Sequence, residues 1–156
     1  MKIKNSDLKL DGINILGLSV DFIPSDDVNE LPSLDFDINF DIMSIQEQGK
    51  FRIIMEIAYN IGKTRKGGYS FYVIGEGNYS FNNFQSKTKK EIDEFLIFSG
   101  VPILINYIRS QLATVTASFP YGQFMLPTID MADLVRRKEL EIRKAEKKAE
   151  KKVVTE

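Results

Sequence analysis

The sequence predicts an α+β domain, a four-stranded antiparallel sheet followed by helices that pack on one face of the sheet. Three observations support this fold class. Apolar and polar residues alternate strictly along 34–45, as in a half-buried strand. The other strand-like segments also precede residue 82, and helical periodicity begins only after Thr88. Strands and helices that are separated along the chain are typical of an α+β fold.

The strands are predicted from apolar periodicity and from the turn residues that separate them. In the second segment the alternation places every apolar side chain on one face and the aspartates on the other. Short connections predict an antiparallel meander, with a basic, glycine-rich hairpin loop at 62–68 and a bulge or bend at Gly75–Gly77. The predicted strands are 13–23, 34–45, 51–61 and 69–81.

The helices are predicted from capping residues and from spacings of three and four. Thr88 and Glu91 have capping-box spacing, which predicts a short helix that ends near Gly100. Pro102 suits the first turn of a second helix, and Phe119-Pro120 suits its end. After Pro127 a last helix is expected to begin at Asp130. The expected buried face of the second helix comprises Leu104, Tyr107, Ile108, Leu112 and Val115.

The second half of the chain resembles the SecB-type export chaperones. The motifs that carry the resemblance are Tyr107-Ile108-Arg109, Phe119-Pro120 and Leu126-Pro127-Thr128-Ile129-Asp130, followed by a helix from Met131. With the four preceding strands, the resemblance covers roughly residues 10–135. It implies a cytoplasmic chaperone domain over residues 1–135, which assembles as a dimer of dimers through an edge strand and helices. We therefore expect a homo-oligomer, with a tetramer ahead of a dimer.

An apolar binding groove is the first candidate site. Flexible methionine and aromatic side chains suit a binder of many different unfolded segments, because they repack around each at low cost. The alternative interpretation is that these residues belong to an ordinary core. SecB-like chaperones hold non-native polypeptides in such grooves, so the resemblance implies an ATP-independent holdase for unfolded or precursor polypeptides. The candidate lining residues are Phe40, Ile42, Phe51, Tyr121, Phe124, Met125 and Leu126.

The composition argues against catalysis and against a metal site. The chain has no cysteine and no histidine, which excludes thiol nucleophiles, histidine bases and Cys/His metal centres. No nucleophile–base pair can be assigned, so we expect no enzymatic activity and no cofactor. No continuous apolar run reaches the length of a membrane span, and the N-terminus lacks the apolar block of a signal peptide. We therefore expect a cytoplasmic protein without stable membrane insertion.

An acidic strand face is the second candidate site. Asp35, Asp37 and Asp41 lie on one face of the second strand, with Asp21 expected nearby. Their spacing is that of a solvated face, and no calcium-loop pattern is present. SecB-like proteins dock a translocase motor partly through acidic positions on the sheet. Here Leu18, Val20, Phe22 and Ile74 occupy the corresponding region, which leaves docking to such a motor in doubt.

Residues 136–156 form a charged tail, predicted to be helical or disordered. The stretch Arg136–Lys152 carries a charge of +5, so the rest of the chain carries −6. A solubilising tail is the favoured interpretation. Interspersed glutamates weaken any stripe for tracking phosphates, so no nucleic-acid partner is expected. Glu139 and Arg143 are spaced for an ion pair. The tail lacks the cysteine/histidine zinc site that is frequent in the family.

Two other classes of function remain open at this point. The sheet and the long helix could enclose one apolar cavity, as in a small-ligand- or lipid-binding domain. The fold could also serve only to oligomerise, as a structural assembly module. Co-purified lipid would favour the first, and an oligomer that fails to suppress aggregation of denatured clients would favour the second.

Overall fold

A computed structural model describes residues 5–24, 36–45, 48–62 and 65–153, with side chains described as far as 144. The chain divides into two compact units, Met1–Leu126 and Pro127–Glu156, which are considered separately below. This division lies nine residues before the domain boundary expected from the sequence. The first unit contains the whole sheet and the long helix, and it confirms the α+β class.

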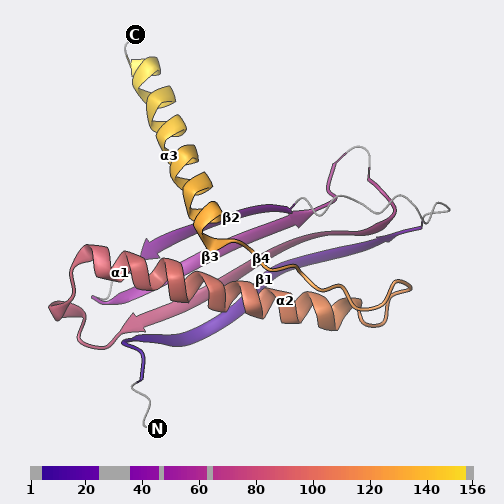
Figure 1. The fold of residues 1–156 in the computed structure, drawn as a ribbon, viewed down its shortest axis with the longest axis horizontal. Helices are drawn as coiled ribbons and strands as arrows, with labels where there is room; N and C mark the ends of the chain where they lie inside the picture. Colours follow the sequence, from indigo (N-terminus) through magenta and orange to yellow (C-terminus); the bar gives the residue numbers. More distant parts are fainter. Residues whose placement is uncertain (1–4, 25–35, 46–47, 63–64, 154–156) are drawn as a thin grey trace. The chain divides into compact units, whose positions relative to one another are not determined.

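The four strands form one antiparallel sheet in the order β1-β4-β3-β2 (Figure 1). Strands β2 to β4 form the predicted meander. β1 does not pair with β2 but lies beside β4, as in a Greek-key arrangement. A four-strand meander was therefore wrong for the first strand, because the β1–β2 connection crosses to the opposite edge of the sheet. The strands are β1 (Leu8–Ile23), β2 (Phe36–Ser44), β3 (Lys50–Tyr59) and β4 (Gly68–Phe81).

The strand boundaries differ from the prediction mainly at β1 and β3. β1 begins five residues earlier than expected, because Leu8 and Leu10 pair with the end of β4. β3 ends at Tyr59, since Asn60 adopts a left-handed conformation with φ of 51° and turns the chain. The amide of Asn60 then bonds the backbone of Lys66 and of Tyr69, which closes the predicted hairpin. Lys63 of that loop and Leu34 and Asp35 of the second predicted strand lie outside the described residues.

The predicted bulge at Gly75–Gly77 was wrong, because the β3–β4 ladder runs through these glycines without a shift. The irregularities lie instead in β1, between Leu10 and Gly12 and between Ile15 and Gly17. A Cβ added to Gly75 would lie 3.0 Å from Cδ1 of Ile108. The glycine is therefore needed where the helix approaches the sheet closely.

A single helical rod crosses one face of the sheet (Figure 1). It consists of α1 (Lys89–Phe95), the π-helical turn η2 (Leu96–Gly100) and α2 (Val101–Thr116), after a short 3₁₀ turn η1 (Phe84–Ser86). A helix end near Gly100 was therefore wrong. Pro102, which cannot donate a backbone hydrogen bond, lies just after the π-helical turn.

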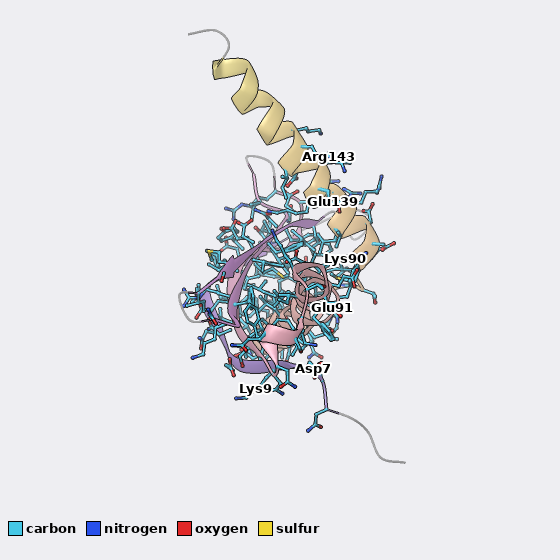
Figure 2. All side chains as sticks on the ribbon, turned by 90° about the vertical axis from the view of Figure 1, so that its left-hand side faces the viewer. Asp7, Lys9, Lys90, Glu91, Glu139 and Arg143 are labelled. Carbon is cyan, nitrogen blue, oxygen red and sulfur yellow. The ribbon has the colours of Figure 1, made fainter. Side chains whose placement is uncertain are left out.

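The capping box at the start of α1 is confirmed. The Thr88 side chain accepts a bond from the Glu91 backbone N–H, and the Glu91 carboxylate accepts one from the Thr88 backbone. This hydrogen bonding holds the pKa of Glu91 below its usual value. Lys87, just before the cap, pairs with Asp7 at 2.7 Å and lies 5.1 Å from the centre of the Phe95 ring. Figure 2 shows Asp7 and Lys9 at the entry to β1 and Glu91 on α1.

The core lies between the helical rod and the sheet. The buried helix face follows a spacing of four from Leu104 through Ile108 and Leu112 to Thr116, so Val115, predicted to be buried, is 36% exposed. Tyr107 is half-buried rather than part of the core. Tyr79 lies fully buried below the rod, and its hydroxyl donates to the Gly100 carbonyl at 2.8 Å. Each fully buried aliphatic side chain contributes about 1.5–3 kcal/mol.

The rod Lys89–Thr116 is long and apolar enough, by length and composition, to cross a membrane. The sequence had led us to expect no such segment. One face of this helix is covered by the sheet, and core helices of globular domains have the same composition. The apolar composition is therefore explained by packing within the first unit.

The second unit consists mainly of α3 (Met131–Val153). The predicted start is confirmed, because the Asp130 carboxylate accepts bonds from the backbone N–H groups of Ala132 and Asp133. Asp133 pairs with Arg136 and Arg137 one turn later, which lowers its pKa. Between Glu139 and Arg143, both labelled in Figure 2, the described part of α3 contains no ion pair.

Candidate functional site

The connection that follows α2 returns along the helix across one end of the sheet (Figure 1). Over residues 118–126 it forms turns and irregular chain rather than helix or strand. Three side chains hold its backbone. The Tyr69 hydroxyl donates to the Gly122 carbonyl at 2.5 Å, the Phe124 N–H donates to Oγ1 of Thr116 at 2.7 Å, and Nε of Arg109 donates to the Leu126 carbonyl at 2.8 Å.

These contacts explain two motifs of the sequence. Arg109, the last residue of Tyr107-Ile108-Arg109, fixes the point at which the chain approaches Pro127. Thr116 is fully buried, and its hydroxyl is satisfied as a donor to the Leu112 carbonyl and as an acceptor from Phe124. The end of α2 and the connection are thus joined by a buried hydroxyl, which costs little because both of its bonding roles are used.

Eight aromatic side chains, three on this connection and five on the strands below it, are in contact and are called here the aromatic cluster. Phe124 lies at its centre, with ring centroids 5.2 Å from Phe71, 5.5 Å from Tyr59, 5.7 Å from Tyr69 and 6.3 Å from Phe36. Several of these ring pairs are tilted or edge-on, arrangements that stabilise beyond the area they bury. The cluster comprises Phe22, Phe36, Tyr59, Tyr69, Phe71, Phe119, Tyr121 and Phe124.

Strand register creates this cluster. Phe36 pairs with Tyr59, and Tyr59 pairs in turn with Phe71 on β4, so the three rings share one face across three strands. On β1, the other neighbour of β4, Phe22 pairs with Tyr69. The alternation along 34–45 placed Phe36 on an apolar face, but the sequence did not show which residues of the four strands would be neighbours. For that reason Phe22, Phe36, Tyr59, Tyr69 and Phe71 were missed as site residues.

The connection is apolar on its exposed side as well. Tyr121 is 50% exposed and Met125 is 60% exposed, whereas Leu126 is buried and Phe124 is half-buried. Side chains along 123–126 therefore alternate between solvent and the sheet. Exposed large apolar residues beside an aromatic cluster are what a site for apolar polypeptide segments requires.

The hydroxyls of Tyr59 and Tyr69 in this cluster stay neutral at physiological pH. Burial raises the pKa of Tyr59 and of Tyr69, so both hydroxyls remain protonated and able to donate. Within the described residues no group of three or more acidic side chains could hold a metal ion. The neutral, aromatic lining of the cluster is suited to apolar contact.

The seven predicted lining residues lie at different places, four on the connection and three on the sheet. Tyr121, Phe124, Met125 and Leu126 lie together on the connection. Phe51 lies near the start of β3, where its ring contacts Phe81 and Phe84. Tyr59 lies eight positions after Phe51 on β3, about 26 Å along the strand. Between these ends, Phe40 is 5% exposed and pairs with Met55, and Ile42 pairs with Ile53.

The acidic face divides between the two edges of the sheet. Asp37 and Asp41 are exposed on β2, and Asp35 lies outside the described residues. Asp21 lies on β1 and pairs with Arg65 at 2.7 Å. Because β4 and β3 lie between β1 and β2, Asp21 is about 14 Å or more from the β2 carboxylates, so its expected place beside them was wrong.

The centre of the same face is occupied by mixed polar contacts. The Arg52 guanidinium bonds Asn78 at 3.2 Å and Glu76 at 3.4 Å, and the Asn14 amide donates to Glu76. Ile54 and Ile74 are half-buried beside them. This network crosses three strands and leaves charges of both signs, so the face does not form an acidic patch.

Comparisons with known proteins support the fold. No family model matches the sequence, and no curated protein matches it significantly. The structure is similar to a SecB-like chaperone of Mycobacterium tuberculosis, solved in complex with a ChAD peptide from the HigA1 antitoxin. The TM-score is 0.55 with 13% identity, over 80% of this chain and 88% of that chain. A Streptococcus agalactiae protein of unknown function is similar over 78% of this chain and 97% of that chain, with a TM-score of 0.43 and 11% identity. The similarity to the mycobacterial SecB-like chaperone shows that the chain has a SecB-like fold.

Proposed function

We propose that this protein is a holdase chaperone that binds non-native polypeptides without ATP. The observation that carries the proposal is the apolar connection, with exposed Tyr121 and Met125 seated on an aromatic cluster, in a SecB-like fold. The similar mycobacterial chaperone was solved with a peptide, which supports a polypeptide as the class of ligand. We expect this activity in the cytoplasm and without catalysis.

Binding would be driven by burial of apolar surface, at roughly 25 cal/mol per Å². Tyr121 and Met125 offer exposed area, with half-buried Phe124 between them. Buried Phe40 and Leu126 would form the floor of the site rather than its contact surface. Ile42 and Phe51 would extend the site along β2 and β3 toward the far end of the sheet. An unfolded segment long enough to reach from Tyr121 to Phe51 would contact both regions.

The proposal includes assembly through β1. This strand lies at an edge of the sheet and has exposed apolar side chains at Leu10 (40%), Leu16 (54%) and Leu18 (36%). An exposed edge strand is a template for pairing with another chain. Pairing of β1 with its copy across a two-fold axis would cover this edge and these leucines. We propose a tetramer ahead of a dimer.

Suppression of aggregation tests the function. The purified protein is mixed with a chemically denatured client that aggregates on dilution, and light scattering is followed with and without ATP. We expect suppression at stoichiometric amounts and no effect of ATP. The variant Tyr121→Ser/Met125→Ser should weaken client binding about 30-fold or more, since central contacts of this kind commonly contribute about 1–2 kcal/mol each and every 1.4 kcal/mol is a factor of ten.

Exposed apolar residues outside the site supply a matched control. Leu140 and Ile142 on α3 are 45% and 48% exposed, close to the values of Tyr121. The variant Leu140→Ser/Ile142→Ser should suppress aggregation as the unmodified protein does. An equal loss in both double variants would show that general surface apolarity, rather than this site, binds the client.

A further inference from the structure

Phe124, the central residue of the connection, packs among the strand residues as a side chain of a bound ligand would. Phe124 inserts its ring among Phe36, Tyr59, Tyr69 and Phe71 from a backbone that belongs to no helix or strand. Side chains of this stretch alternate between the sheet and solvent. An extended segment of an unfolded protein carrying an aromatic residue has the same chemistry and the same shape.

The strands supply the rings of Phe36, Tyr59, Tyr69 and Phe71, which together are called here the seat. The connection supplies Phe124, which fills it. Tyr59 and Phe71 are paired residues of the two central strands and are almost fully buried. Phe124, in contrast, is half-buried, and the next residue, Met125, is 60% exposed. Segments with exposed backbone and few buried contacts open locally before the core does. The ring can therefore leave while the strands that form the seat stay in place.

Three side-chain bonds to the backbone hold the segment around Phe124, and they are local. Near Phe124 the backbone bonds to the Thr116 hydroxyl, and on either side it bonds to Tyr69 through Gly122 and to Arg109 through Leu126. The outer two bonds involve carbonyls two residues away from Phe124. Phe124 can thus swing out while the connection stays attached at both of these points.

We propose that Phe124 is the resting occupant of the seat formed by the rings of Phe36, Tyr59, Tyr69 and Phe71, and that an aromatic side chain of an extended client segment displaces it. This inference rests on the proposed holdase function and adds a competitor within the chain. It makes the rings on β3 and β4 the specificity-determining surface for aromatic residues. Tyr121 and Met125 remain client contacts at its rim.

The sign of the change in affinity tests the inference. In the unmodified protein the apparent dissociation constant equals the intrinsic constant divided by the fraction of molecules with an empty seat. If Phe124 fills the seat for about nine-tenths of the time, Phe124→Ala should tighten binding of a permanently unfolded client about tenfold. Thr116→Val, which removes the acceptor for the Phe124 N–H, should also tighten binding. Met125→Ala is the matched control on the same segment and should weaken it.

The chain contains no tryptophan, so Phe124→Trp gives a single reporter. Its emission should be blue-shifted in the free protein and should move to longer wavelength when a tryptophan-free client is added. A client that binds while Trp emission stays unchanged, or while Phe124→Ala weakens binding, would overturn the inference and leave the holdase function intact. Absence of client binding by every variant would overturn both.

Discussion

Replacement of Tyr79 by phenylalanine tests how the helical rod is fixed to the sheet. The Tyr79 side chain is 1% exposed, and its hydroxyl donates to the Gly100 carbonyl at 2.8 Å. Removal of a buried hydrogen bond of this kind costs about 1 kcal/mol. At pH 8 we therefore expect Tyr79→Phe to lower the free energy of unfolding by about 1 kcal/mol.

The same substitution should behave differently at high pH. Burial raises the pKa of Tyr79 from 10.0 to about 12. Between these values the unfolded chain has lost the phenolic proton and the folded chain has kept it, so stability falls as the pH rises. The contribution of Tyr79 is complete below pH 10 and is lost as the pH approaches 12, and by pH 11 about 1 kcal/mol is gone.

The two effects predict a crossing of stabilities. Phenylalanine does not ionise, so Tyr79→Phe avoids the loss at high pH and should be as stable as the unmodified protein, or slightly more stable, near pH 11. Tyr59 and Tyr69, whose pKa values are also raised, are present in both proteins and cancel. Urea unfolding followed by circular dichroism at pH 8 and pH 11 measures the difference. If the difference in the free energy of unfolding between the two proteins is the same at both pH values, then the Tyr79 hydroxyl is not held buried and neutral in the folded protein.

Three further substitutions test the other contacts that shape the site. Thr88→Ala removes the capping box and should cost about 1 kcal/mol in urea unfolding; an unchanged midpoint would contradict the cap. Gly75→Val places atoms within contact distance of the rod and should cost roughly 1–3 kcal/mol. Gly12→Ala is its control, because an added Cβ there meets nothing within 4 Å, and it should leave the free energy of unfolding unchanged. An equal loss of stability in both variants would argue against close packing at Gly75. Arg109→Gln removes the bond to the Leu126 carbonyl and should speed amide hydrogen exchange around residue 126 while sheet amides keep their rates; uniform acceleration would mean a global effect instead.

The features predicted correctly from the sequence are those that depend on near neighbours. The alternation along β2 places side chains on two faces whatever the strand pairs with. Thr88 with Glu91, and Asp130 with the start of α3, satisfy backbone groups within three residues. Such local bonding is readable from spacing alone.

The features that were missed depend on pairing between distant segments. Periodicity does not encode strand order, so the place of β1 beside β4 could not be read from it. Gly75 has the same appearance in the sequence whether it forms a bulge or lies under Ile108. The aromatic cluster needs the register that sets Tyr59 beside Phe71, and a register shift of one residue would place these rings on opposite faces.

The most direct test of the holdase function is the mass of the protein by light scattering, alone and after mixing with a permanently unfolded client. We expect an oligomer of four chains, or two, that forms a stable complex with the client and keeps it when ATP is added. The mass of the complex would then give the number of chains per client. A monomer whose mass does not change when the client is added would contradict both the assembly through β1 and the proposed function.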